Sequence, residues 1–424
     1  MHQPRSHWPR VLAVSASAVL AAAPATAAHA DSTGNAAPAW PAFALSRVSL
    51  AADGSQAVGH SFFASISGTG RYVAYRTNAL NAGGPQTVVR DVLTGHTSPV
   101  ILRPDGGPSQ ATEIIRTSVS ADGRYVAFCS MAGDLVPGTV PFRAIRVFVR
   151  DTRTGTTTLA SVDSKGAEFP ADSAPAILSG DGRSVAFTSA GRVYVRQLDT
   201  ATTVEASIAP PGEDWRWGAA SGFPSLSADG RSVAFTHQDG GQPAVYVRDL
   251  VASVTTRASV TTTGDPAMGS QPSLSPDGRY VAFVSSAPKV TPGTVTSDQV
   301  YRRDLLLRKT VRVSVTPAGA AANAESSDPS IAAGGRYVVF ASGASDLVPG
   351  DTNYDRDIFV RDVQAGTTVR INVAPNGSQA NSATGWAQPL ISADGTSVVF
   401  SSFASNLVPG DTNGFEDVFV ASAR

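Results

Sequence analysis

The sequence has 424 residues, a formal net charge of -1 and a single cysteine. Because acidic and basic side chains are nearly balanced, the charge favours neither a nucleic acid nor an anionic membrane as a partner. One cysteine cannot form an intramolecular disulfide. We therefore expect the fold to be stabilised by a large core rather than by covalent cross-links.

The first 30 residues have the parts of a secretory signal. Arg5 and Arg10 provide a basic start, an apolar run follows, and an Ala-His-Ala cleavage site ends at Ala30. The apolar run is shorter than the roughly 20 residues that a membrane-spanning helix needs, so we expect no membrane insertion. We predict a signal peptide over residues 1–30, a linker over 31–43, and a secreted or cell-envelope protein that is soluble after cleavage.

One nine-residue phrase recurs seven times along the rest of the chain. It reads SADGRYVAF at 120–128 and SPDGRYVAF at 275–283, with small variations elsewhere. A fixed phrase at a period of roughly 50 residues is typical of repeat architectures. The central glycines of the seven copies are Gly70, Gly123, Gly182, Gly230, Gly278, Gly335 and Gly395.

Each repeat contains four strand signals in the same order. A short strand such as 272–275 enters an Asp-Gly turn, which supports a tight hairpin, and the next strand, such as 280–284, is almost continuously apolar. A third strand ends in Val-Arg-Asp, and a fourth alternates polar and apolar residues before a glycine. Four antiparallel strands at this period predict an all-β fold, a seven-bladed β-propeller over residues 44–424.

The two ends of the array complement each other. The seventh repeat stops after its third strand, 417–421, whereas 44–54 matches a fourth strand and precedes the first repeat. An unpaired sheet edge is unfavourable, so we predict that Ser46–Leu50 pairs beside Val418–Val420 and closes the ring.

The Ser-x-Asp-Gly-Arg-x-Val-Ala-Phe and Val-Arg-Asp units resemble the WD-like repeats of TolB-type propellers, over roughly residues 44–424. The resemblance implies the fold and says little about activity, because such blades occur in Tol-system proteins, beside peptidase domains and in polysaccharide lyases. TolB carries an additional N-terminal α/β domain that has no counterpart in this sequence. We therefore do not expect the Tol-system role to transfer.

The two kinds of connection between strands differ in length. Turns after strands one and three are short, whereas nearly all length variation lies in the loops after strands two and four. Because strands alternate in direction, each kind emerges on its own face of the propeller. Variable loops on a rigid scaffold commonly carry binding sites, so we predict that the face bearing these loops is the functional one.

Two of the variable loops are near duplicates that contain the pattern Asp-x-Asn-x-x-x-Asp. Oxygen ligands at alternate loop positions suit Ca²⁺, and the pattern resembles the calcium loops of other propellers. The alternative is that these aspartates only cap turns, since the corresponding loop of repeat two has no carboxylate there. The candidate ligands are Asp351, Asn353 and Asp357 in one loop and Asp411, Asn413 and Asp417 in the other.

A third loop, 210–223, combines two tryptophans with two carboxylates. Exposed tryptophans can stack on sugar rings or on an apolar patch of a partner. The alternative is that they fold down as lids over the blade edge. The candidate ligand-binding residues are Glu213, Asp214, Trp215 and Trp217, with Trp386 in the equivalent loop before repeat seven.

Catalytic signals are weaker. His60, His96 and His237 belong to repeats one, one and four, with His96 on the opposite face, so no histidine cluster is expected; Cys129 extends a buried strand. We favour a monomeric, non-catalytic extracellular binding scaffold whose partner is a protein or a glycan. The second hypothesis is a secreted polysaccharide lyase or hydrolase, which would need two or more titratable groups that converge on one substrate atom.

Overall fold

The structure of the protein is a computed structural model. The predicted signal peptide and most of the predicted linker lie outside the described residues, so the signal peptide stays a prediction. No helix within the described residues is long and apolar enough to cross a membrane. The structure describes residues 40–51, 53–79, 81, 85–109, 116–138, 144–215, 220–238, 241–385 and 387–423.

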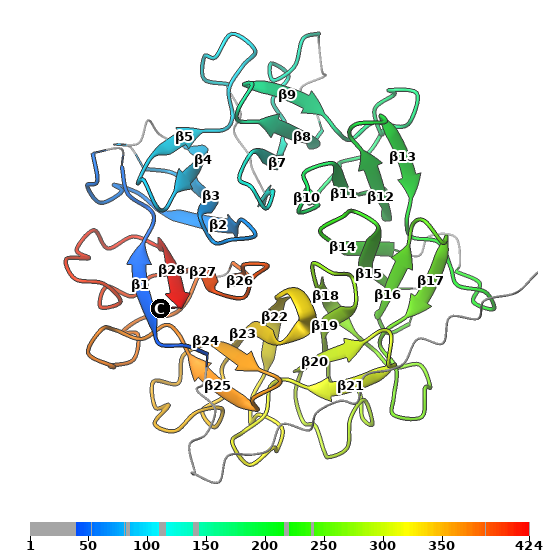
Figure 1. Cartoon of the computed structure of the whole chain (residues 1–424), viewed down its shortest axis with the longest axis vertical. Helices are drawn as coiled ribbons and strands as arrows, with labels where there is room; N and C mark the ends of the chain where they lie inside the picture. Colours follow the sequence, from blue (N-terminus) through cyan, green and yellow to red (C-terminus); the bar gives the residue numbers. More distant parts are fainter. Residues whose placement is uncertain are drawn as a thin grey trace, which may run out of the picture. The chain divides into compact units, whose positions relative to one another are not determined.

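The strands of this part of the chain form seven four-stranded antiparallel sheets that lie in a ring (Figure 1). Successive sheets contact each other in sequence order, and β2 of the first blade contacts β27 of the last. The seven-bladed propeller predicted from the repeats is thus confirmed. Within each blade the first strand lies at the central channel and the fourth at the rim.

The second and third strands have six or seven residues in every blade, whereas the first strands vary from two to seven. Blades 1 to 4 consist of β2 (Ser61–Ile66), β3 (Tyr72–Thr77), β4 (Gln86–Asp91) and β5 (Thr97–Pro99); β6 (Thr117–Val119), β7 (Tyr125–Ser130), β8 (Arg146–Asp151) and β9 (Thr156–Leu159); β10 (Ile177–Leu178), β11 (Ser184–Ser189), β12 (Arg192–Gln197) and β13 (Thr202–Glu205); and β14 (Ala220–Leu226), β15 (Ser232–Gln238), β16 (Ala244–Asp249) and β17 (Val254–Arg257). Blades 5 to 7 consist of β18 (Ser270–Leu274), β19 (Tyr280–Ser285), β20 (Gln299–Asp304) and β21 (Lys309–Arg312); β22 (Ser326–Ile331), the short 3-10 helix η2 (Ala333–Gly335), β23 (Tyr337–Ser342), β24 (Asp357–Asp362) and β25 (Thr367–Arg370); and β26 (Leu390–Ile391), β27 (Ser397–Ser402), β28 (Asp417–Ala423) and β1 (Phe43–Arg47).

The N-terminal strand completes the last blade, as predicted. In the antiparallel pair of β1 and β28, Ser46 lies opposite Val420, and the amide of Val48 donates to the carbonyl of Val418 at 2.8 Å. The propeller also includes residues that we assigned to the linker. Trp40 is only 3% exposed, and its indole Nε1 donates to the carbonyl of Gly395 at 2.9 Å.

In five blades the repeated phrase connects the two turns on one side of the blade through an arginine–aspartate pair. In blade 2, Gly123 takes a φ of +76°, and the guanidinium of Arg124 donates two hydrogen bonds to the carboxylate of Asp151 at the end of the third strand. Asp151 also accepts from the amides of Arg153 and Thr154 in the next turn. Equivalent pairs occur in four other blades: Arg71–Asp91, Arg231–Asp249, Arg279–Asp304 and Arg336–Asp362.

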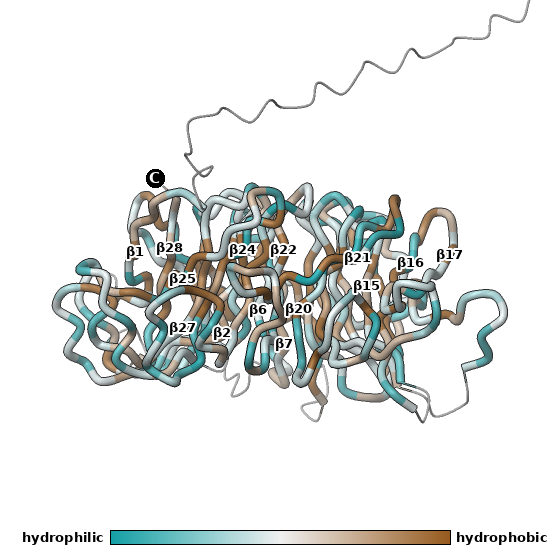
Figure 2. Tube along the Cα trace, turned by 90° about the horizontal axis from the view of Figure 1, so that it is seen from below, coloured by the Kyte–Doolittle hydropathy of each residue, from teal (hydrophilic) through white to brown (hydrophobic). Residues whose placement is uncertain are grey.

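We call the side formed by these turns the turn face and the opposite side, formed by the connections after strands two and four, the loop face. The edge-on view shows the strands running between the two faces, with the C-terminal end on one of them (Figure 2). Because Phe43 pairs with Ala423 at the end of β28, both ends of the described chain lie on the turn face.

The core fills the spaces between and within blades. The central Val-Ala-Phe residues of the second strands are fully buried, as in Val126 and Phe128, and Phe128 stacks on Phe148 of the third strand with ring centroids 5.8 Å apart. Such apolar burial stabilises a fold without disulfides. Cys129 belongs to this core, is completely buried as expected, and burial raises the pKa of its thiol to about 12.

Candidate functional site

The central channel encloses a cavity of about 690 Å³. The innermost strands of all seven blades line it. A volume of this size falls in the range that suits a small-molecule ligand or a chain end. The two ends of the channel differ in the side chains that they present.

At the turn face the channel is lined by small residues on hydrogen-bonded backbone. The amide of Ala121 donates to the carbonyl of Gly180 in the next blade at 2.8 Å, and Ala228 donates in the same way to Pro276. A Cβ atom added to Gly68 would lie 2.8 Å from the Cβ of Ala121, which leaves no room for a side chain. The small repeated residues and the hydrogen bonds between blades therefore fix the shape of this end of the channel.

At the loop face the residue that each blade contributes varies in chemical character. The position is the same in every repeat, four residues before the first residue of the nine-residue phrase. Three blades present apolar side chains, two present amides and two present charges: Phe63, Pro175 and Phe223; Gln271 and Gln388; Arg116 and Asp328.

Four of these seven residues occupy strained backbone. The register of β2, β14, β18 and β22 against the second strand shifts at a bulge. Phe63 (φ 52°), Phe223 (φ 52°), Gln271 (φ 49°) and Asp328 (φ 53°) all adopt the left-handed region without being glycine. Such conformations cost of order 1 to 3 kcal/mol each and cluster at functional sites, so the bulges mark this end of the channel as the candidate site.

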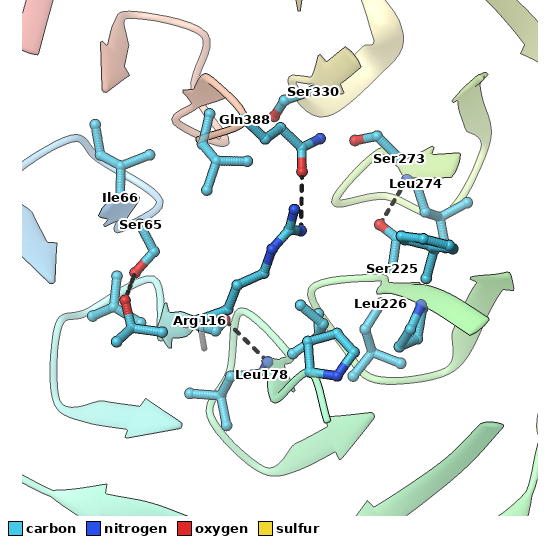
Figure 3. A pocket seen from close by; sticks show the side chains of 18 of the residues that line it. Ser65, Ile66, Arg116, Leu178, Ser225, Leu226, Ser273, Leu274, Ser330 and Gln388 are labelled. Atoms are coloured by element: carbon cyan, nitrogen blue, oxygen red, sulfur yellow. Dashed lines mark hydrogen bonds between the residues drawn. The ribbon is translucent and has the colours of Figure 1, made fainter. Parts of the chain in front are cut away.

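The polar residues of this end interact across the channel. Arg116 of blade 2 points toward blade 7, where its guanidinium donates to Oε1 of Gln388 at 3.4 Å (Figure 3). Oε1 of Gln271 accepts from the amide of Asp328 at 2.8 Å. The carboxylate of Asp328 pairs with the guanidinium of Arg356, which lies in the loop after β23.

Apolar side chains occupy the neighbouring arc formed by blades 3 and 4. Phe223 is 61% exposed although it lies on strained backbone, and Pro175 lies beside it in the lining. Phe63 of blade 1 packs edge-to-face on Phe62, with centroids 4.9 Å apart. An exposed aromatic ring beside fixed polar groups is the usual composition of a binding site.

The tryptophan loop forms a second, smaller pocket of about 350 Å³ above blade 4, away from the channel lining. Trp215 is partly buried and stacks on His237 with ring centroids 3.6 Å apart. Glu213 accepts from the indole of Trp215 at 3.1 Å and from the hydroxyl of Tyr246 at 2.6 Å. Burial raises the pKa of Tyr246 to about 12.

The geometry of this loop fits the lid alternative for Trp215, because its ring packs against core residues of blade 4. Asp214 is exposed and lines the same pocket. Glu213 and Asp214 line this pocket and do not belong to the described lining of the channel. Trp217 and Trp386 lie outside the described residues, so a ligand-binding role for the tryptophans stays a prediction.

In the duplicated loops an arginine lies between the aspartates. The guanidinium of Arg370 is 2.8 Å from Oδ1 of Asp351 and 3.0 Å from Oδ2 of Asp357, and Asn353 donates to Asp357 at 3.3 Å. Asn372 also donates to Asp357, at 2.5 Å.

The second loop repeats this arrangement with an arginine from the N-terminal strand. Arg47 is 3.0 Å from Asp411 and 3.5 Å from Asp417, and Asn413 donates to Asp417 at 2.9 Å. Burial raises the pKa of both Asp411 and Asp417. Calcium would have to displace a guanidinium in either loop. The donor set thus fits a bound arginine better than a metal, and within the described residues no three His, Cys, Asp or Glu side chains gather as metal ligands.

Sequence reasoning did not single out the seven residues at the loop-face end of the channel. The signal was present, because this one position varies from Phe to Arg to Gln to Asp beside a nearly constant phrase. This variation becomes visible only when all seven repeats are aligned on that phrase. The tryptophans and the duplicated loops are more conspicuous in a single repeat.

Comparisons with solved structures show similarity to other propellers. An oligogalacturonate lyase in complex with manganese matches at 12% identity and a TM-score of 0.55, over 90% of this chain and 93% of that chain. The propeller domain of the trilobed protease from Pyrococcus furiosus matches at 11% identity and a TM-score of 0.52, over 86% of this chain and 94% of that chain. TolB from Acinetobacter baumannii matches at 15% identity and a TM-score of 0.38, over 83% of this chain and 76% of that chain.

No family model matches the sequence, and no curated protein matches it. The trilobed-protease domain is described as having an open velcro topology, whereas β1 closes the ring here. The TolB match is too distant to carry an argument about role. At these identities the comparisons establish one conclusion, that the chain has the β-propeller fold seen in the lyase and in the trilobed-protease domain.

Proposed function

We propose that the protein is an exported, non-catalytic binding propeller that takes its ligand at the loop-face end of the central channel. The observation that carries this proposal is the set of four bulges that hold Phe63, Phe223, Gln271 and Asp328 in left-handed backbone around one opening. A scaffold role alone gives no reason to keep this strain at four equivalent positions. Export follows from the predicted signal peptide.

The composition of the opening supports binding rather than catalysis. Among the described residues that line the channel, Asp328 is the one carboxylate, and Arg356 already pairs with it. A lyase or hydrolase would need at least two titratable groups that act on one substrate atom. The lyase hypothesis therefore rests on the similarity to the oligogalacturonate lyase, which extends only to the fold.

A pull-down with matched variants tests the proposal. The mature protein is immobilised and incubated with culture supernatant and with solubilised cell-wall extract. Phe223→Ala removes a ring that is 61% exposed at the channel, and Val251→Ala removes an apolar side chain that is 71% exposed on the turn face. We expect a protein or glycan that the wild type and Val251→Ala retain and that Phe223→Ala loses by tenfold or more.

Two results would count against this reading. Retention that survives Phe223→Ala and is lost in Val251→Ala would place the binding surface on the turn face. New reducing ends or unsaturated sugars, released from a polysaccharide by the wild type and not by Asp328→Asn, would favour the lyase or hydrolase.

A further inference from the structure

The charges at the channel do not cancel. The described lining contains two charged side chains, Arg116 and Asp328, and a third, Arg356, contacts Asp328 from outside the lining. Two guanidinium groups thus face one carboxylate. Because Arg356 and Asp328 neutralise each other, the excess positive charge among the described residues of the channel belongs to Arg116.

Arg116 is half-buried and only weakly engaged. Its one hydrogen bond to another described residue is the 3.4 Å contact with Oε1 of Gln388, a neutral acceptor at the long end of the distance range. A guanidinium has five N–H donors and strongly prefers a carboxylate, which it binds through two parallel hydrogen bonds. The close view shows this side chain extending into the open channel rather than onto a wall (Figure 3).

Further donors and an apolar wall surround this position. Nε2 of Gln271 and the hydroxyl of Ser273 line the channel and have no hydrogen-bond partner among the described residues. Gln388 is held in place because its Nε2 donates to the carbonyl of Pro329 at 2.7 Å. Phe223 of blade 4 lines the same channel, and its exposed ring offers apolar contact.

We propose that the channel binds a small organic anion, a carboxylate with an apolar or aromatic flank, and that Arg116 pairs with the carboxylate while Phe223 contacts the flank. This inference rests on the proposed function and names its ligand class. A monoanion fits better than a phosphate dianion, since only one positive charge is in excess and Asp328 would repel a second negative charge. The cavity of about 690 Å³ suits a ligand of this size.

The test compares pairs of ligands that have the same shape and differ in charge. Phenylacetate and 3-phenylpropionate are titrated against phenylacetamide and 3-phenylpropionamide by isothermal calorimetry. For the wild type we expect the carboxylates to bind at least tenfold more tightly than the amides. Raising the salt concentration should weaken the carboxylates and leave the amides unchanged, because salt screens the ion pair.

Variants at two arginines of the same blade identify the group responsible. Arg116→Gln should reduce the preference for the carboxylate to about onefold, and Arg116→Lys should restore part of it. Arg153→Gln removes an exposed arginine from the turn face and gives the same net charge, so its preference should equal that of the wild type. Circular dichroism checks that each variant is folded.

Several results would overturn the inference. These are equal affinity for acid and amide, a preference that survives Arg116→Gln, and no saturable binding of either acid at millimolar concentration. Glucuronate is the polar comparator, and tighter binding of glucuronate than of phenylacetate would refute the apolar flank. The anion inference can fail while the proposed function stands: a ligand captured in the pull-down that requires Phe223 and is still held by Arg116→Gln would refute the anion and leave channel binding intact.

Discussion

On the turn face, aspartates at the ends of third strands meet partly exposed arginines from the repeated phrase, whereas on the loop face the aspartates of the duplicated loops are buried. Hydrogen bonds from Arg71 and Arg124 hold the pKa of Asp91 and Asp151 down at about 2. Burial instead raises the pKa of Asp411 and Asp417, even with Arg47 beside them. On the turn face the repeated arginine pairs thus favour the charged form of the aspartates. On the loop face burial disfavours the charged form.

The same contrast holds inside the channel. At the turn face, glycine and alanine repeat on hydrogen-bonded backbone, and each blade resembles its neighbour. At the loop face, Phe63, Phe223, Gln271 and Asp328 are strained and chemically different. We infer that the repeat preserves stability on one face and that specificity arises on the other, where the blades diverge.

The largest expected effect comes from removing the arginine that joins the N-terminal strand to blade 7. Arg47→Met leaves the buried carboxylates of Asp411 and Asp417 without their cation, which costs about 3 kcal/mol or more. Arg370→Met is the matched variant in blade 6, where no chain end is involved. Urea denaturation of both variants measures the difference in unfolding free energy.

We expect Arg47→Met to be the more destabilising of the two, because Arg47 belongs to β1, the strand that closes the ring. A loss below about 1 kcal/mol in both variants would show that these pairs behave as exposed surface ion pairs. The arginine pairs of the loop face would then contribute no more to stability than exposed ion pairs do, and the two faces would not differ in this respect.

A glycine substitution on the turn face has the next largest effect. Gly123 has a φ of +76°, and a Cβ atom there would lie 2.2 Å from the ring of Tyr72 in the preceding blade. Gly123→Ala should therefore cost about 2 kcal/mol or more, from backbone strain and overlap together. Gly106 on the loop face has a φ of +84°, and a Cβ atom added there would have no heavy atom within 4 Å. Gly106→Ala therefore measures the cost of backbone strain alone, about 1 kcal/mol.

Chemical denaturation of both glycine variants measures the two costs. Equal losses would mean that Tyr72 moves aside without cost. The turn face would then be less rigid than its close packing implies.

Acid should act in opposite directions on the two faces. The folded-state pKa of Asp151 is lowered from 3.8 to about 2, so its contribution is present above pH 3.8 and is lost as the pH falls toward 2. The folded-state pKa of Asp417 is raised, so its unfavourable contribution is relieved as the pH falls through that raised value. We expect stability to peak on the acidic side of neutrality and to fall below about pH 4.

One pair of variants isolates the contribution of the turn-face aspartate to the pH dependence of stability. Arg124→Gln should be destabilised at neutral pH, and its difference from the wild type should shrink toward pH 2 as Asp151 becomes protonated. Arg183 holds the same place in blade 3, where Gln197 replaces the aspartate, so Arg183→Gln should show no such pH dependence. Thermal unfolding across pH checks both, and parallel curves for the two variants would contradict the assignment.

The sequence specified the architecture because each level of the repeat agrees with the others. Turn glycines, apolar second strands and the Arg124–Asp151 type of pair recur, and the missing fourth strand of blade 7 identified the role of β1. The bulges could not be predicted, since first strands such as Ala220–Leu226 show no clear alternation of polar and apolar residues that an extra residue would interrupt. Only the shifted register of β14 against β15 reveals it.

The candidate site was less predictable because its partners are distant in sequence. The pattern around Asp411 and Asp417 suits calcium when read locally, and the arginine that lies between them, Arg47, comes from the other end of the chain. Trp215 likewise reads as an exposed aromatic until His237 and Tyr246 of the blade below are placed beside it.

The smallest expected effect tests calcium directly. A metal that binds only the folded state raises stability by about 2.7 kcal/mol at a hundredfold excess over its Kd, which is a rise of several degrees in Tm. Because Arg370 and Arg47 already occupy the space between the aspartates, we expect the Tm of the metal-free wild type to differ by less than about 1 °C between chelator and millimolar Ca²⁺.

Arg370→Met removes the guanidinium from one site and keeps Asp351, Asn353 and Asp357, so this variant should gain stability from Ca²⁺ if those oxygens can converge. A rise of several degrees in the wild type would mean that calcium displaces the guanidinium, and the loop face would then carry metal sites as well as the channel opening. No response in either protein would leave the aspartates as partners of arginine, and the duplicated loops would then serve the scaffold in the same way as the turn-face pairs.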